Sequence, residues 1–229
     1  MRLSEQEAAD LLTHGDPIAL GREADAERRR RFGDTVTFIV DRNINYTNIC
    51  VNECRFCAFY TKQDAPDAYL LPMEEILAKV GETAAAGGTQ VMIQGGIHPD
   101  LPLSYYENML RSIRERYPSI VIHSFTATEI LYFAQKEGIT VEDTLRRLQD
   151  AGLASLPGGG AEILVDRVRR LIAPKKIMTE DWLRVMRTAH KIGMESTATM
   201  VIGFGETMAE RVEHMEHIRR LQEETGGFR

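Results

Sequence analysis

The stretch TVTFIVDRNINYTNICVNECRFCAFY, residues 35–60, joins an apolar segment of strand-forming residues to a loop that contains every cysteine of the chain. Cys50, Cys54 and Cys57 lie within eight consecutive residues. Three closely spaced cysteines do not suit a disulfide framework, which pairs an even number of them along a chain. We therefore interpret the loop as a metal site that follows a buried strand at residues 35–40.

Strands and helices alternate after this first strand. β-Branched and apolar segments predict four more strands, and amphipathic segments predict helices between them. The expected strands cover residues 35–40, 89–96, 119–127, 153–159 and 196–204, and the expected helices cover residues 73–87, 105–117, 129–152 with a break near Gly138, 161–172, 179–193 and 208–224. Such alternation indicates right-handed βαβ units and a parallel sheet. A (β/α) TIM-type barrel and a doubly wound open sheet both match the pattern.

The domain organisation follows from the same pattern. Residues 1–34 are expected to form an N-terminal helical extension, and residues 35–229 the β/α domain. A closed eight-stranded barrel takes about 250 residues, whereas five strands are predicted within these 229 residues. If the sheet belongs to a barrel, we expect it to be incomplete, with about five βα units and the C-terminal strands missing.

Composition excludes several classes of protein. The chain has 28 Lys and Arg against 34 Asp and Glu, which gives a net charge of −6. Nucleic-acid binders that rely on bulk positive charge are therefore excluded. No apolar run approaches the roughly 18–20 residues that cross a bilayer, and the polar, acidic N-terminus does not resemble a secretory signal. A cytoplasmic location is expected.

The cysteine spacing, Cys50-x-x-x-Cys54-x-Phe56-Cys57, favours a cluster over zinc. Structural zinc takes four ligands and commonly combines a Cys pair with a second Cys or His pair. His98 and His123 follow the loop without forming such a pair. Three thiolates suit a [4Fe–4S] cluster in which one iron stays open for a small molecule. A zinc-stabilised, non-catalytic binding module is the alternative.

This cysteine pattern resembles the defining motif of the radical S-adenosylmethionine (SAM) enzymes. Longer strings resemble the menaquinone-pathway and deazaflavin-pathway members of that superfamily; they are DRNINYTNICVNECRFCAFY, QGGIHPD, HSFTATEI, SLPGGGAEIL, ATMVIGFGET and LQEETGGF. The resemblance runs along the whole chain. It implies a TIM-type barrel, a [4Fe–4S] cluster held by the three cysteines, and SAM bound at the open iron. In such enzymes one electron from the cluster cleaves SAM and produces a 5′-deoxyadenosyl radical.

Within this group, the chain most resembles the enzymes that cyclise dehypoxanthine futalosine on the futalosine route to menaquinone. The Asn-Tyr-Thr-Asn stretch at residues 45–48 and GFGET at residues 203–207 favour that reaction. The alternatives are aminofutalosine synthase and a subunit of deazaflavin (FO) synthase. The resemblance also implies a small-molecule substrate and an electron donor such as flavodoxin or ferredoxin.

Residues at the ends of the predicted strands are the candidates for binding SAM. By resemblance, Phe56 packs near the adenine, the glycine pair meets the SAM amino group, and polar side chains after the third strand reach the ribose or the methionine moiety. Ile97 follows the glycine pair where many relatives have an acidic residue. The candidates are Phe56, Gly95, Gly96, Ser124, Thr126, Glu129, Glu162, Val201 and Gly203.

Histidines supply the remaining candidates. His98 and His123 lie at the ends of predicted strands, and imidazole titrates near neutral pH, so each is a candidate catalytic base or substrate contact. His214 and His217 form an H-x-x-H pair within the charged segment RVEHMEHIRR. That segment predicts a solvated helix face rather than a metal site.

Overall fold

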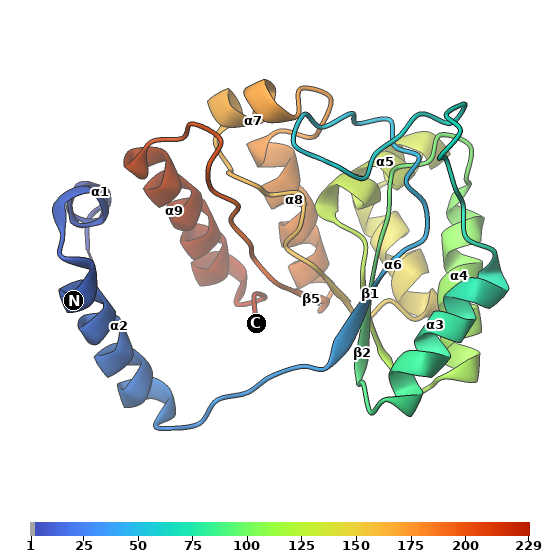
Figure 1. Ribbon diagram of the computed structural model, residues 1–229, viewed down its shortest axis with the longest axis horizontal. Coiled ribbons are helices and arrows are strands. Elements are labelled where there is room, and N and C mark those ends of the chain that lie inside the picture. The colour runs from blue at the N-terminus through green and yellow to red at the C-terminus, as the bar shows by residue number, and fades with distance from the viewer. Residues whose placement is uncertain (1–2) are drawn as a thin grey trace.

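The computed structural model describes residues 3–229 and contains one five-stranded parallel sheet in the order β1–β2–β3–β4–β5 (Figure 1). The strands are β1 Asp41–Asn45, β2 Gln90–Gln94, β3 Val121–Ser124, β4 Ser155–Leu156 and β5 Glu195–Ser196. The helices are α1 Glu5–His14, α2 Pro17–Phe32, α3 Met73–Ala85, α4 Leu103–Arg116, α5 Ala127–Glu137, α6 Val141–Ala151, α7 Asp166–Ile172, α8 Thr179–Lys191 and α9 Met208–Thr225.

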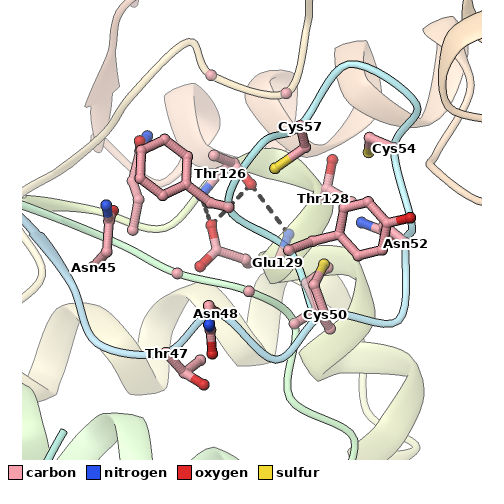
Figure 2. Close-up of a pocket in the computed structure, with 18 of the residues that line it drawn as sticks. Asn45, Thr47, Asn48, Cys50, Asn52, Cys54, Cys57, Thr126, Thr128 and Glu129 are labelled. Atoms are coloured by element: carbon pink, nitrogen blue, oxygen red, sulfur yellow. Dashed lines mark hydrogen bonds between the residues drawn. The ribbon is translucent and has the colours of Figure 1, made fainter. Parts of the chain in front are cut away.

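The predicted alternation of parallel strands and helices is confirmed. Strand order equals chain order, which is the arrangement of a TIM-type barrel, here incomplete with five strands in residues 3–229. In Figure 1 the loop that follows β1 crosses the top of the molecule beside α7, at the carboxyl ends of the strands. Side chains from this loop and from α5 surround the space drawn in Figure 2.

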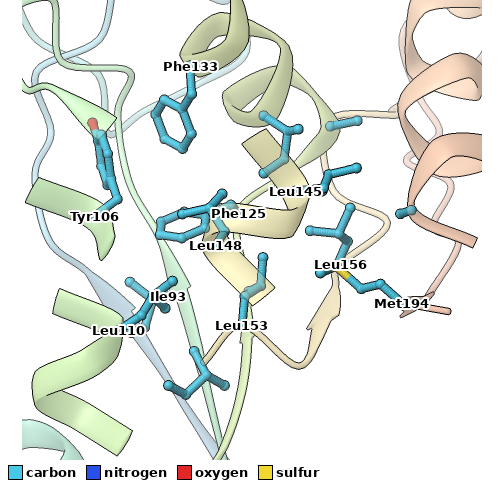
Figure 3. Close-up of a cluster of buried hydrophobic side chains, with 14 of the residues drawn as sticks. Ile93, Tyr106, Leu110, Phe125, Phe133, Leu145, Leu148, Leu153, Leu156 and Met194 are labelled. Atoms are coloured by element: carbon cyan, nitrogen blue, oxygen red, sulfur yellow. The ribbon is translucent and has the colours of Figure 1, made fainter. Parts of the chain in front are cut away.

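Apolar side chains fill the layer between the sheet and its helices (Figure 3). Tyr106 of α4 stacks on Phe133 of α5 with ring centroids 4.2 Å apart, and Phe125 meets both rings edge-on. In α8, buried positions recur every three or four residues, which turns one stripe of the helix toward this core. The stripe consists of Thr179, Trp182, Leu183, Val185, Met186 and Ala189.

Local sequence signals place α5 at the end of β3. Thr126 is its N-cap: the Thr126 hydroxyl accepts a hydrogen bond from the Glu129 amide, and the Glu129 carboxylate accepts one from the Thr126 amide. This reciprocal capping box satisfies amides that would otherwise lack partners. Gly138 ends the helix with φ of 67°, a left-handed conformation that glycine adopts at little cost. The predicted break near Gly138 is confirmed.

The expected first strand at residues 35–40 is wrong. The strand begins at Asp41, and the preceding apolar residues are exposed, with 80% of Val36 and 85% of Phe38 accessible. The pairing explains the difference, because Asp41 pairs with Gln90, the first residue of β2. The last strand is also shorter than expected, since β5 ends at Ser196 and residues 197–204 are not strand.

Two helical expectations need correction. The helix expected over residues 161–172 starts at Asp166, because residues 161–165 are irregular: Glu162 has a φ of 43°, and the Ala161 carbonyl accepts a hydrogen bond from the Arg169 guanidinium. His214 of α9 is buried rather than solvated. Its Nδ1 accepts a 2.9 Å hydrogen bond from the Leu164 amide, so it supports this irregular segment.

The two N-terminal helices precede the sheet and lie at one side of the molecule in Figure 1. α1 packs along α9, and Glu5 forms an ion pair with Arg220 at 2.9 Å. Neither α1 nor α2 has a buried residue. The division into an extension and a barrel domain stays a prediction. Within residues 3–229 we find no helix with the length and apolar character required to span a membrane.

The core predicts a contrast between two leucines. Leu148 of α6 is fully buried, whereas Leu171 of α7 is 47% exposed. We expect Leu148→Ala to lower the free energy of unfolding by about 2–5 kcal/mol because it removes buried methyl groups and leaves a cavity. Leu171→Ala should change it by less than about 0.5 kcal/mol. Urea unfolding followed by circular dichroism measures both, and equal effects would contradict this packing.

Candidate functional site

One cavity of about 320 Å³ lies at the carboxyl ends of the strands. Its wall combines loops that are far apart in the sequence, so the parallel sheet is what brings them together. The loop after β1 contributes most of the wall, and the segments after β2, β3 and β4 complete it. The lining residues are Asn43, Asn45, Thr47, Asn48, Cys50, Asn52, Cys54, Phe56, Cys57, Phe59, Tyr60, Tyr69, Gln94, Gly95, Gly96, Ile97, Thr126, Thr128, Glu129, Gly159, Gly160 and Lys176.

All three cysteines line this cavity, on the loop that follows β1 (Figure 2). Each is a free thiol. Backbone hydrogen bonds fix the loop at both ends: the Cys50 amide donates to the Thr61 carbonyl at 3.2 Å, and the Cys57 amide donates to the Cys54 carbonyl at 3.1 Å. Cys54 also packs against Val168 and Ile172 of α7. The short spacing in the sequence thus becomes three thiols around one space.

Three thiols on the wall of one cavity are a donor set that suits a [4Fe–4S] cluster. A tetrahedral zinc requires its sulfur ligands to converge about 2.3 Å from one point. Among residues 3–229, no group of three or more His, Cys, Asp or Glu side chains is arranged to hold one metal ion. In a [4Fe–4S] cluster each thiolate binds a different iron, so the sulfurs stand farther apart. Burial raises the pKa of the Cys54 thiol to about 11, and the Lys176 charge opposes that rise.

The glycine pair lies where the loop after β2 meets the loop after β1. A Cβ at Gly95 would come within 2.5 Å of the Tyr46 ring, and a Cβ at Gly96 within 2.1 Å of the Ile49 carbonyl oxygen. Both residues line the cavity. Their need for glycine is therefore explained first by packing of the chain against itself, and contact with the SAM amino group stays a prediction.

The polar residues after β3 are placed differently from one another. The Ser124 hydroxyl is buried in the sheet and accepts a 3.2 Å hydrogen bond from the Ile93 amide, so it does not line the cavity. Thr126 and Glu129 do line it. Burial raises the pKa of the Glu129 carboxyl to about 7, although hydrogen bonds from Thr126 act in the opposite direction. This carboxyl therefore exchanges a proton near neutral pH.

Glu162 lies behind the cavity wall rather than on it. Its carboxylate accepts a 2.7 Å hydrogen bond from Lys176 Nζ and lies 3.4 Å from the Arg169 guanidinium. Lys176 itself lines the cavity, with Nζ 5.7 Å from the centre of the Phe56 ring. Phe56 packs against Phe204, with their ring centroids 5.1 Å apart.

Val201 and Gly203 do not line the cavity. The Val201 amide donates a 3.0 Å hydrogen bond to the Glu162 carbonyl, and the Gly203 amide donates to the Glu206 carboxylate at 3.0 Å. Their polar backbone groups thus stabilise the loop that leads into α9. A role in binding SAM stays a prediction for both.

The two candidate histidines also lie away from the cavity lining. His98 is buried, and its Nδ1 accepts a 3.1 Å hydrogen bond from the Asp100 amide. His123 of β3 is buried beside Ser155 of β4, with Nδ1 2.7 Å from the Ser155 hydroxyl oxygen. Burial lowers the pKa of His123 to about 4, which keeps it neutral at pH 7. In the structure both histidines form hydrogen bonds within the protein and thereby stabilise the fold.

The Asn-Tyr-Thr-Asn stretch, which the sequence analysis connected with the reaction, holds the loop in the structure. The Thr47 hydroxyl donates to the Tyr69 carbonyl at 2.6 Å, and the Asn48 amide group donates to the Asp67 carbonyl at 2.9 Å. Thr128 is a lining residue that the sequence analysis missed. The Thr128 hydroxyl is buried, lines the cavity and has no hydrogen-bond partner among the described residues. Its position two residues after Thr126, at the start of α5, is the signal that could have indicated it.

Comparison with known proteins shows one family. A sequence profile described as the Radical SAM superfamily matches residues 44–218. The fold is similar to that of the FeFe-hydrogenase maturase HydG from Carboxydothermus hydrogenoformans, with a TM-score of 0.76 and 20% identity over 98% of this chain and 51% of that one. Methylornithine synthase (PylB) gives a TM-score of 0.74 and 17% identity over 96% of this chain and 62% of that one.

Curated relatives have two different names. The chain is 47% identical to a cyclic dehypoxanthine futalosine synthase of Streptomyces coelicolor and 43% identical to one of Halalkalibacterium halodurans, over 100% and 99% of its length. It is 42% identical, over 96% of its length, to a 5-amino-6-(D-ribitylamino)uracil–L-tyrosine 4-hydroxyphenyl transferase of a Cyanothece species. The chain covers 58%, 62% and 60% of these relatives, respectively.

The packing at Gly96 predicts a large effect of a small substitution. Gly96→Ala should lower the free energy of unfolding by about 1–3 kcal/mol, because its Cβ would overlap the Ile49 carbonyl oxygen. Gly21, inside α2, has open space around its Cβ position. Gly21→Ala should therefore be neutral or stabilising by up to about 1 kcal/mol. Chemical denaturation compares the two, and a harmless Gly96→Ala would refute the close contact.

The Glu129 carboxyl predicts a pH dependence of stability. Its pKa is about 7 in the folded chain against the ordinary value of 4.5, so the folded state holds more protons between these pH values. Stability should fall as pH rises from about 4.5 to 7, by on the order of 1 kcal/mol per pH unit. Glu129→Gln, which retains the capping geometry, should flatten this slope. Glu115→Gln on the exposed side of α4 is the control, and an unchanged slope in Glu129→Gln would rule out the raised pKa.

Proposed function

We propose a cofactor set for this chain, which belongs to the radical SAM superfamily: a [4Fe–4S] cluster bound by Cys50, Cys54 and Cys57, and SAM bound in the adjoining cavity. The observation that supports it most directly is that one loop brings all three thiols to the wall of one cavity. When bound, the cluster supplies the electron that cleaves SAM and so starts a hydrogen abstraction. The other residues of the site would bind and orient the cofactor and the substrate, and would exclude water.

The proposed roles of these residues follow from their placement. Cys50, Cys54 and Cys57 would act as thiolate ligands, and Thr128 has a buried hydroxyl free to bond a ligand group within the described cavity. Glu129 would hold or accept a proton near pH 7 because burial raises its pKa. Apolar Phe56 and Phe59 line the same cavity and would limit the access of water.

We propose that the reaction is the cyclisation of dehypoxanthine futalosine to its cyclic product in the futalosine route to menaquinone. The 47% identity to the cyclic dehypoxanthine futalosine synthase of Streptomyces coelicolor supports this assignment, because the 4-hydroxyphenyl transferases reach 42–43%. The runner-up is the 4-hydroxyphenyl transfer named for the relative that is 42% identical. Aminofutalosine synthesis is the third candidate, and the cluster chemistry is common to all three.

A low-potential protein such as flavodoxin or ferredoxin is the proposed electron donor, because the cluster must receive one electron for each cleavage of SAM. A cytoplasmic location belongs to the same proposal, since free thiols such as the three cysteines persist in a reducing compartment.

Anaerobic reconstitution tests the cofactor assignment. We expect about four iron and four sulfide per chain and a brown absorbance. Cys50→Ala should lose most of that iron, whereas Lys62→Ala, on the exposed part of the same loop, should retain it. A colourless sample with one equivalent of zinc would support the binding module and reject the cluster.

Incubation with alternative substrates tests which reaction the chain catalyses. The reconstituted chain is incubated with SAM, a reductant and either dehypoxanthine futalosine or the ribitylaminouracil and tyrosine pair, and 5′-deoxyadenosine is measured by liquid chromatography. The cyclase assignment predicts 5′-deoxyadenosine and a cyclised product with dehypoxanthine futalosine only. Product formation from the second pair alone would assign the chain to the transferases.

A further inference from the structure

A buried charged cluster lies directly behind the cysteine loop. Lys176, Glu162 and Arg169 have side chains that are 12%, 7% and 1% exposed. Lys176 Nζ donates to the Glu162 carboxylate at 2.7 Å. Arg169 is bound mainly to backbone carbonyls, including those of Gly160 at 3.0 Å and Ile177 at 2.6 Å. These three side chains carry two positive charges and one negative charge, so together they have a net positive charge.

Of these three charged residues, Lys176 is the one that lines the cavity. Among the described residues of the cavity wall, it is the only Lys or Arg. Glu129 is the only carboxylate of that wall, and its pKa of about 7 lets it become neutral. The wall therefore holds one positive charge whose position is fixed by an ion pair.

The segment that ends in Lys176 is attached to the cysteine loop. The Arg55 amide donates a 2.8 Å hydrogen bond to the Ile172 carbonyl, and Cys54 packs against Ile172 and Ala173. Phe56, between Cys54 and Cys57 in the sequence, lies under the Lys176 ammonium group, 5.7 Å from it. Lys176 thus has a defined place next to the three thiols.

Burying a lysine is costly, because its ammonium group loses hydration and its long side chain loses conformational freedom. An ion pair with a buried carboxylate offsets this cost only in part. A hydrophobic residue would pack the same wall at lower cost. The charge itself is therefore the property that the site uses.

We propose that Lys176, positioned by Glu162, is the fixed positive charge that favours the reduced state of the cluster bound by Cys50, Cys54 and Cys57. This inference rests on the proposed function. Reduction adds one electron, and hence one negative charge, to a group beside the ammonium ion, while no covalent bond is formed or broken. In a partly buried site, such a charge pair is strong enough to change an equilibrium about tenfold.

A redox titration of the reconstituted 229-residue chain without SAM tests the proposal. Titanium(III) citrate supplies the electron through mediators, and electron paramagnetic resonance measures the reduced cluster. For Lys176→Gln, whose amide can still donate to Glu162, we expect the ratio of reduced to oxidised cluster at a fixed potential to fall about tenfold. That change corresponds to a midpoint about 59 mV lower for one electron. Lys176→Arg, which keeps the charge, should retain the parent midpoint.

Lys175 provides the matched control. It neighbours Lys176 in the sequence and has the same charge, but its side chain is 54% exposed and pairs with Glu53 of the cysteine loop at 2.8 Å. Solvent screens such a pair, so Lys175→Gln should leave the midpoint close to that of the parent. An equal shift in both variants would show a general surface-charge effect and overturn the proposal.

The iron content distinguishes a failure of the proposed function from a failure of the proposed role of Lys176. A parent chain without iron refutes the proposed function itself. Variants that hold about four iron and have the parent midpoint refute only the role of Lys176. Lys176→Met is the second neutral variant. Loss of iron from both neutral variants, with iron retained in Lys176→Arg, would make Lys176 a structural support and would also overturn the redox role.

Discussion

The close approach of the backbone after β1 to the backbone after β2 is the constraint on which the site depends. The Gly96 amide donates to the Thr47 carbonyl at 2.8 Å, and the Val51 amide donates to the Ile97 carbonyl at 3.1 Å. These bonds hold the start of the cysteine loop against the neighbouring loop. A side chain at Gly96 would separate the two segments. The position of Cys50 is thus a consequence of a backbone contact that only glycine permits.

A second attachment fixes the other end of the cysteine loop. α7 and the residues after it contact the loop through Cys54 and the Arg55 amide, and Lys176 follows in the same segment. The irregular residues 161–165 lead into α7, and Arg169 and His214 bind their backbone. Supports buried at one end of the sheet therefore determine where the thiols lie, so changes far from the cavity can alter it.

The sequence predicted the parts of the molecule that local chemistry determines. The cysteine spacing, the Thr126–Glu129 cap and the break at Gly138 each depend on residues within a few positions of one another. Residues 35–40 were mispredicted because their apolar, β-branched composition suits a buried strand, yet the pairing with β2 begins at Asp41, after one bond from the Thr89 amide to the Val40 carbonyl. Lys176 was missed, and His214 was wrongly expected to be solvated, because their contacts with Phe56 and Leu164 are made by residues distant in the sequence. Burial of a polar side chain depends on tertiary contacts, and the local sequence pattern does not reveal these contacts.

The two names among the relatives are informative about where the reaction is chosen. The chain is 47% and 42% identical to proteins named for different reactions, so the cofactor site proposed here is compatible with both names. The proposed cofactor site consists of the cysteine loop, its contact with the glycine pair, and the buried charged residues Lys176, Glu162 and Arg169 behind the loop. Within the proposed function, side chains that face the cavity without supporting the fold are the candidates for contacting the substrate. Thr128 is such a side chain, because its buried hydroxyl has no bond to the described protein, whereas Thr47 and Asn48 are already engaged in holding the loop. Reactions on a common scaffold diverge through such uncommitted groups.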